Sequence, residues 1–225
     1  MRIVSSNETV ARILAAACLM LAGCLPYTVG STARPAPEGE LRQTGTMYAI
    51  PGAFESEYDS VSIPMRGLDM EVRYGIDDRS DIGLRIPSLS GAVVTYKRRL
   101  DGASDDPGVA FAVMAGAGFV NFGEHGLGEL TLIASGDDDA VVIPYGGIRG
   151  MHVVPLSRYG VSDHPTVGGF LGLRIGRADF GISPEIGVYY DPSALELRER
   201  RWIIVPAVSV HGERLLNALG GVFGF

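Results

Sequence analysis

The sequence has few of the residues that build metal centres or disulfides. Its 225 residues include two cysteines and four histidines. The histidines are His125, His152, His164 and His211, and their spacing is not that of metal ligands. No glycine-rich loop leads into a helix that could bind a phosphate. We therefore expect neither a metal nor another cofactor.

Positive charge is also in short supply. The chain has 19 basic and 26 acidic residues, and its formal net charge is −7. A nucleic-acid-binding surface must offer basic side chains to the phosphates, so this charge argues against a nucleic-acid partner. The apolar run at residues 13–22 is shorter than the roughly 20 residues that a helix needs to cross a bilayer.

That short apolar run belongs to a targeting segment, residues 1–23, which begins with basic residues as signal peptides do. The segment ends in Leu21-Ala22-Gly23-Cys24, which resembles the lipobox of bacterial lipoproteins. The resemblance implies cleavage before Cys24, lipidation of its thiol, and acylation of the new N-terminus with a fatty acid such as palmitate. Leu25 follows the cysteine in place of the Asp that retains lipoproteins at the inner membrane of enteric bacteria, which favours the outer membrane. An ordinary secretory signal with a chance cysteine is the alternative.

The mature chain divides into a short tether and one domain. Residues 24–38 are predicted to form a flexible, lipidated tether, because Pro35 and Pro37 prevent regular pairing and the small polar residues offer nothing to bury. Residues 39–225 are predicted to form a single β-barrel domain, and their number suits one domain. We expect the tether to anchor this domain in the periplasm-facing leaflet of the outer membrane.

The barrel prediction depends on strict two-residue alternation, since successive side chains of a strand point to opposite faces. In residues 180–190, Phe180, Ile182, Ile186 and Val188 alternate with small or charged residues. Similar segments predict about ten strands, within a range of eight to twelve. They lie at residues 40–50, 66–76, 81–86, 92–97, 108–120, 130–134, 140–155, 167–175, 180–191 and 202–211. The fold class is therefore all-β, a single antiparallel up-and-down barrel.

The apolar face could line a soluble barrel or cover a membrane barrel. Its aromatic residues lie near strand ends, as in the girdles of membrane barrels, and these are Tyr74, Tyr96, Phe180, Tyr190 and Trp202. The opposite face combines glycine with charges of both signs, which suits a narrow lumen. The membrane barrel is favoured. A soluble barrel or sandwich stays open, because prolines such as Pro184 and Pro206 are awkward in central strands.

The sequence RYGIDDRSDIGLR, at residues 73–85, is similar to hairpins that are common in small outer-membrane β-barrel proteins. The terminal Phe225, with Phe223 two residues before it, resembles the C-terminal signal of such barrels. These resemblances imply a barrel architecture and carry no catalytic residues. Barrel-assembly and lipoprotein-sorting machinery would be partners, besides membrane lipid at Cys24 and the barrel exterior. The tail, residues 213–225, also fits a short helix.

Charged residues on the glycine-rich face form the candidate functional site. They are Asp69, Glu71, Arg73, Arg85, Lys97, Arg174 and Glu185. One interpretation is an ion-pair network that fills the lumen and prevents leakage. The other is a constriction that selects ions in a narrow pore.

Enzymatic activity is not expected. Ser209 and His211 share one face of a strand, and Glu185 on a nearby strand could complete a nucleophile, base and orienting acid. Outer-membrane lipid A deacylases use these residue types on a barrel wall, although here Ser precedes His. The sequence therefore predicts a lipid-anchored outer-membrane barrel with a structural or narrow-pore role. The alternatives are a periplasm-facing lipoprotein whose soluble barrel or sandwich binds an apolar ligand and, more distantly, an esterase or deacylase.

Overall fold

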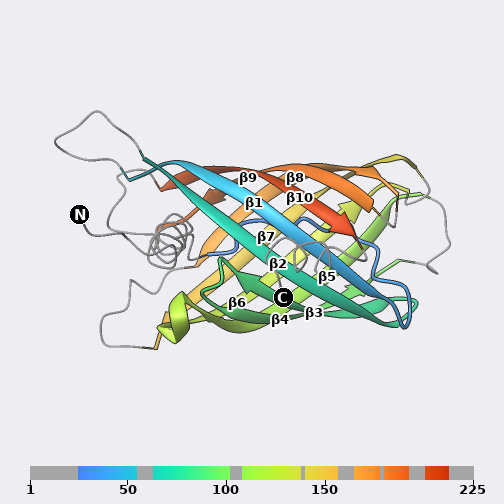
Figure 1. Cartoon of the computed structure of the whole chain (residues 1–225), viewed down its shortest axis with the longest axis horizontal. Coiled ribbons are helices and arrows are strands. Elements are labelled where there is room, and N and C mark those ends of the chain that lie inside the picture. The colour runs from blue at the N-terminus through green and yellow to red at the C-terminus, as the bar shows by residue number, and fades with distance from the viewer. Residues whose placement is uncertain are drawn as a thin grey trace, which may run out of the picture.

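The computed structural model describes residues 25–54, 63–101, 108–137, 140–156, 165–177, 180–192 and 201–212. Ten strands in these ranges form a closed antiparallel barrel, in which each strand pairs with its sequence neighbours and β1 pairs with β10 (Figure 1). The predicted fold class is thus confirmed. Cys24, the targeting segment and the tail at residues 213–225 lie outside the described residues. Within the described ranges, no helix is long and apolar enough to span a membrane.

The strand bounds follow the alternation closely. The strands are β1 (Leu41–Phe54), β2 (Ile63–Asp77), β3 (Ser80–Pro87), β4 (Ala92–Arg99), β5 (Ala110–Val120), β6 (His125–Ser135), β7 (Val142–Pro155), β8 (Thr166–Gly176), β9 (Phe180–Tyr190) and β10 (Trp202–Gly212). A short 3₁₀ helix, η1 (Asn121–Gly123), joins β5 to β6. The strand expected at residues 130–134 is longer than predicted, because the glycines before it continue the ladder with β7.

The two ends of the barrel differ in their connections. We call the end at which β1 begins and β10 finishes the terminal end, and the opposite end the loop end. The terminal end contains the shortest connection, residues 78–79 between β2 and β3. Of the longer connections, residues 55–62, 156–165 and 191–201 lie at the loop end, and residues 100–109 lie at the terminal end.

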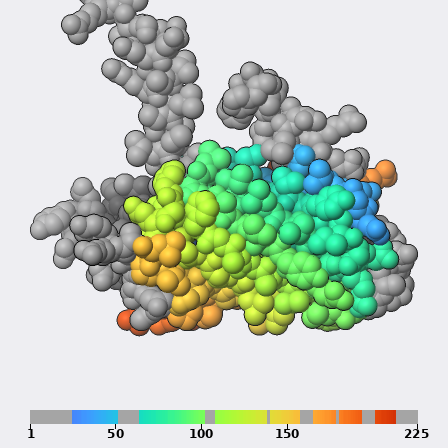
Figure 2. Space-filling view, turned by 90° about the horizontal axis from the view of Figure 1, so that it is seen from below, coloured from blue at the N-terminus to red at the C-terminus, as the bar shows by residue number. Residues whose placement is uncertain are grey.

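Burial alternates along the strands, with charged and polar side chains inward and apolar side chains outward. In β3, Asp81 and Arg85 are buried, whereas Ile82 and Leu84 are 42% and 46% exposed. The wall formed by β2 to β7 is continuous in the space-filling view (Figure 2). The prolines that the sequence made doubtful, Pro184 and Pro206, point outward, and the register between β9 and β10 runs through both without a shift.

Inward glycines leave room for large inward side chains. A Cβ atom at Gly67 would lie 2.1 Å from the Tyr48 ring, and one at Gly172 would lie 2.4 Å from the Tyr145 ring. Both tyrosines are buried. The small residues of this face are therefore explained by crowding inside a narrow barrel.

The lumen is filled by residues 25–37, which we call the inner segment. Tyr27, Thr28, Val29, Thr32 and Ala33 are each at most 5% exposed. Figure 1 shows this part of the chain, in blue, running through the barrel before it turns into β1 at the terminal end. The sequence predicted a flexible tether here, with nothing to bury. That interpretation is wrong for the inner segment, because the polar lumen offers hydrogen-bond partners that an isolated segment does not have.

Candidate functional site

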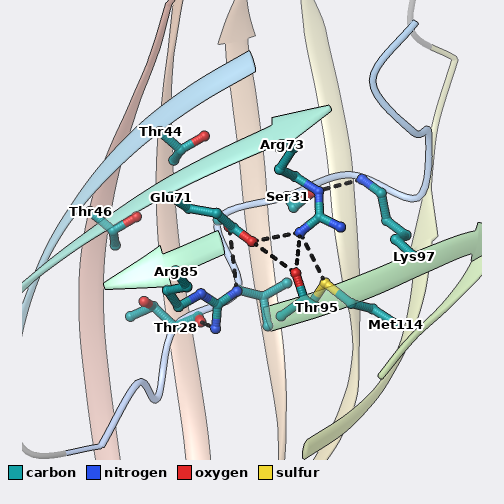
Figure 3. Close-up of polar contacts among 12 residues, drawn as sticks. Thr28, Ser31, Thr44, Thr46, Glu71, Arg73, Arg85, Thr95, Lys97 and Met114 are labelled. Atoms are coloured by element: carbon teal, nitrogen blue, oxygen red, sulfur yellow. Dashed lines mark hydrogen bonds and ion pairs between the residues drawn. The ribbon is translucent and has the colours of Figure 1, made fainter. Parts of the chain in front are cut away.

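A chain of ion pairs crosses the lumen from β3 to β7. Arg73 contacts both Asp81 and Glu71, and Glu71 Oε2 lies 3.4 Å from Arg85 Nη2 (Figure 3). On the other side, Arg85 Nη1 lies 3.7 Å from Glu129 Oε1. The last ion pair on this side joins Glu129 and Arg149. At the opposite end of the chain of ion pairs, Lys97 Nζ lies 3.4 Å from Asp81 Oδ2. Alternation of oppositely charged groups lets these buried ions neutralise one another.

The cations of this network also bind carbonyl groups of the inner segment. Arg149 Nη1 donates to the Thr28 carbonyl at 2.6 Å, and Arg85 Nη1 donates to the same oxygen at 3.4 Å. Lys97 Nζ donates to the Thr32 and Arg34 carbonyls at 3.2 and 2.8 Å. Arg149, Arg85 and Lys97 therefore each have both a carboxylate and a backbone partner, which supports burial of their charges.

Acidic groups and one hydroxyl bind the amides of the inner segment. Glu185 accepts hydrogen bonds from the amides of Val29 and Gly30 at 2.9 and 2.8 Å. Asp81 Oδ2 accepts from the Ala36 amide at 2.8 Å, and Ser135 Oγ accepts from the Ala33 amide at 3.1 Å. Side chains of the wall thus satisfy the backbone of the inner segment in place of a strand ladder.

Gly30 allows the closest approach between the inner segment and the wall. Its φ is +57°, in the left-handed region of backbone conformation that residues other than glycine rarely adopt. A Cβ atom at this position would lie 2.5 Å from Ser209 Oγ on β10. The position therefore requires glycine for both its backbone conformation and its packing.

The candidate residues from the sequence take different positions in this arrangement. Glu71, Arg73, Arg85 and Lys97 belong to the ion-pair chain, and Glu185 binds the inner segment. The two remaining candidates are placed elsewhere. Asp69 accepts a hydrogen bond from the Ser88 amide at 3.2 Å, and Arg174 lines a cavity at the terminal end.

Asp81, Glu129 and Arg149 complete the chain of ion pairs, and sequence reasoning did not single them out. The sequence did contain the pattern that would identify them, because each of the three charged residues is next to an apolar residue that points outward. Glu129, for example, precedes Leu130, which is 54% exposed. Strand parity alone would have identified these residues as inward charges.

The proposed catalytic group is not assembled. Ser209 Oγ bonds to Thr46 Oγ1 at 2.8 Å. The hydroxyls beside the His211 ring are those of Ser183, 2.7 Å from Nε2, and Thr44, 3.1 Å from Nδ1. Glu185 bonds to the inner segment and to the Tyr145 hydroxyl. Ser209, His211 and Glu185 therefore have separate partners, because residues two apart on β10 face different neighbours across the ladders.

The cavity at the terminal end has a volume of about 130 Å³. It lies between the inner segment and the wall, and Lys97, Arg174 and His211 are among its lining residues. In the part of the chain that the structure describes, no group of three or more His, Cys, Asp or Glu side chains could hold a metal ion.

Comparison with known proteins gives structural likeness only. No family model and no curated protein matches the chain. Neisserial surface protein A is 12% identical, with a TM-score of 0.35, over 77% of this chain and 96% of that chain. The outer membrane protein OprG from Pseudomonas aeruginosa is 14% identical, with a TM-score of 0.32, over 81% and 97%. Ail of Yersinia pestis is 12% identical, with a TM-score of 0.31, over 77% and 96%. The structure is similar to these small outer-membrane β-barrel proteins.

Proposed function

We propose that this protein is a lipid-anchored barrel of the outer membrane whose lumen is closed by its own inner segment. Its role would be structural, as a sealed membrane body that holds its loops and its lipidated N-terminus in place. The observation that carries the proposal is the distribution of polarity, with hydrocarbon side chains outside and a filled, charged lumen inside. The exterior supports the membrane location, and the interior supports the sealed state.

The outer face is apolar across its middle, and outward charges such as Arg98 lie near strand ends. Leu84, Leu130, Ile148, Leu171 and Ile204 are between 46% and 70% exposed. Outward aromatic residues lie near both ends, with Tyr74, Tyr96, Phe111 and Phe180 toward the terminal end and Phe119 and Trp202 toward the loop end. Soluble monomers rarely expose such a continuous apolar surface. Burying one such side chain away from water is worth roughly 1.5–3 kcal/mol, which favours a bilayer around the wall.

The lumen argues against the soluble carrier of an apolar ligand. Such a carrier needs an apolar cavity, whereas charged side chains from six strands and the inner segment occupy this interior. An esterase is not supported either, because Ser209 and His211 bond to different partners.

Membrane embedding can be tested without the lipid anchor. A variant that carries Cys24→Ala behind a cleavable secretory signal should remain in the membrane fraction and require detergent for extraction. The lipidated parent protein is the control for expression and sorting. A variant recovered in folded form without detergent would contradict the proposed membrane barrel.

A second candidate function is a narrow passage that opens when the inner segment leaves. The inner segment is held by side-chain contacts and not by a ladder, so its removal would leave the wall pairing intact. The full chain should show no single-channel conductance in a planar bilayer. A variant in which a secretory signal is fused directly to Glu38 should conduct. Equal conductance of both proteins would contradict the sealed lumen.

A further inference from the structure

The inner segment enters the lumen at the loop end. The Tyr48 hydroxyl, from the middle of β1, donates to the Leu25 carbonyl at 3.0 Å. The same hydroxyl lies 3.5 Å from Ser88 Oγ, in the turn between β3 and β4. At its other end the segment leaves the lumen at the terminal end, where Glu38 pairs with Gly75. Leu25, the first described residue, therefore lies at the loop end, and the predicted lipidation site, Cys24, directly precedes it in the sequence.

The rim beside the point where the inner segment enters includes short connections that are joined by backbone hydrogen bonds. The turn between β3 and β4 is closed by the Ser90 amide, which donates to the Pro87 carbonyl at 2.8 Å. The Phe122 amide in η1 donates to the Ser90 carbonyl at 2.6 Å. The Leu156 amide, after β7, donates to the Glu124 carbonyl at 2.8 Å. These bonds join three connections into one ordered stretch of rim.

Large apolar side chains project from this stretch, and we call Leu89, Phe122 and Leu156 the apolar rim. Leu89 is 54% exposed, Phe122 is 83% exposed, and Leu156 is 65% exposed. Leu89 and Phe122 also have positive φ angles of 57° and 54°. Gly or Asn ordinarily occupies such positions, because a bulky side chain strains the backbone there. If the rim were surrounded by water, Leu and Phe at these strained, exposed positions would add no stability over Gly or Asn. Contact with hydrocarbon would instead favour apolar side chains at these positions, despite the strain.

We propose that the acyl chains on Cys24 leave the lumen over the turn between β3 and β4 and enter the bilayer beside the apolar rim. The partner surface is thus the lipid leaflet that surrounds the loop end. Outer-membrane barrels have short periplasmic turns and longer extracellular loops. The longest connection here, residues 191–201, is at the loop end, whereas three of the four connections at the terminal end have at most six residues, the exception being residues 100–109. The leaflet is therefore the one that faces the cell exterior. This inference rests on the lipid anchor proposed above, and it differs from the periplasm-facing leaflet that the sequence suggested.

The path of the lipid can be mapped with a photoreactive fatty acid. Cells are supplied with a fatty acid that carries a diazirine and an alkyne, and labelled protein is irradiated in its membrane. Peptides cross-linked to the acyl chain should come from the loop end, around Leu89, Phe119 and Phe122. Cross-links concentrated around Tyr74 and Phe180 at the terminal end would overturn the inference and leave the lipid anchor standing. The Cys24→Ala variant is the matched control, and an equal lack of label in the parent protein would overturn both proposals.

Two rim variants separate a lipid-contacting role from a purely structural one. Leu89→Asn and Phe122→Asn suit a positive φ, so neither should lower the unfolding temperature in detergent. Each should reduce the yield of acyl cross-links at the loop end at least twofold. Leu100→Asn, an exposed apolar residue toward the terminal end, should leave the yield unchanged. An unchanged yield in both rim variants would overturn the contact with the apolar rim.

The leaflet is identified by thiol labelling of intact cells. The only thiol of the mature chain is the one expected to be lipidated, so an added cysteine gives a clean signal. A membrane-impermeant maleimide should label Glu124→Cys, an exposed polar position at the loop end, and spare Asp78→Cys at the terminal end. Labelling of Asp78→Cys alone would place the loop end in the periplasm and overturn the assignment to the exterior leaflet.

Discussion

At the scale of single residues, Lys97 shows how the wall holds the inner segment. It is the only lysine of the chain, and its side chain is 2% exposed inside the lumen. Its ammonium group can donate three hydrogen bonds, and it contacts Ser31, Thr32 and Arg34 besides Asp81. One compact cation thus connects β4 to three residues of the inner segment and to the ion-pair chain.

We expect Lys97→Met to be strongly destabilising. The substitution keeps the length of the side chain but leaves Asp81 and two carbonyl groups without this donor. Removing one partner of a buried ion pair costs about 3–5 kcal/mol. The measurement is the free energy of unfolding in detergent with urea. Arg98→Met, one residue along and on the exposed outer face, should change it by less than about 0.5 kcal/mol. Equal losses in the two variants would contradict a special role for Lys97.

At the scale of elements, the inner segment is a strand-like chain without strand partners over most of its length. Its hydrogen bonds come from β1, β3, β4, β6, β7 and β9, so strands around most of the ring position it. Glu185 on β9 and Ser135 on β6 bind its amides from different sides of the lumen. Its position is thus a property of the closed barrel and not of the segment itself.

The path of the inner segment can be tested with paired cysteines. Ala33 and Ser135 lie in contact, with 3.1 Å between the Ala33 nitrogen and Ser135 Oγ. In the double variant Ala33→Cys/Ser135→Cys, a disulfide should form in the membrane and appear as a linked peptide in mass spectrometry. Ala33→Cys with Leu132→Cys is the control, because Leu132 points outward on the same strand. Equal disulfide yields in the two pairs would contradict a segment inside the lumen.

The connection after β4 contains a carboxylate, Asp101, whose contribution to the stability of the fold depends on pH. Asp101 accepts hydrogen bonds from Arg99 Nε and Nη2 at 3.1 and 2.9 Å, and these hold the pKa of Asp101 at about 2. The carboxylate therefore stabilises the fold above its unfolded pKa of about 4, and this contribution is lost as pH falls through 2. Asp101→Asn should reduce stability by up to about 1 kcal/mol at pH 7, because the Asp101 carboxylate is partly exposed to solvent, which weakens the pair. The difference from the parent chain should disappear near pH 2, and a difference that is constant with pH would contradict it.

At the scale of the whole molecule, the barrel and its content must assemble together. The inner segment passes from one end to the other of a closed wall, and the N-terminal acylation proposed above would make it too bulky to be threaded afterwards. The pairing of β1 with β10 joins the first and last strands of the ring, and it covers only Gln43–Tyr48 on β1. We infer that this seam closes around the inner segment.

The charge network predicts the ion preference of an opened barrel. In the variant that begins at Glu38, Glu71→Ala removes a negative charge from the lumen, and Arg85→Ala removes a positive one. The first should shift selectivity toward anions and the second toward cations, as measured by reversal potentials in a salt gradient. Identical reversal potentials for the two variants would contradict a lumen in which these residues face the permeating ions.

The sequence by itself determined the ten strands, because alternation is a local property that each strand carries in its own residues. It also determined which side chains share a face, including Glu71 with Arg73 and Ile82 with Leu84. Only the tertiary structure decided the place of the inner segment and the partners of the charges. Glu185 is 156 positions from Val29 along the chain, and Arg149 is 121 from Thr28. Such pairs meet only when the ring closes, because closure creates the enclosed polar space in which an unpaired backbone is stable.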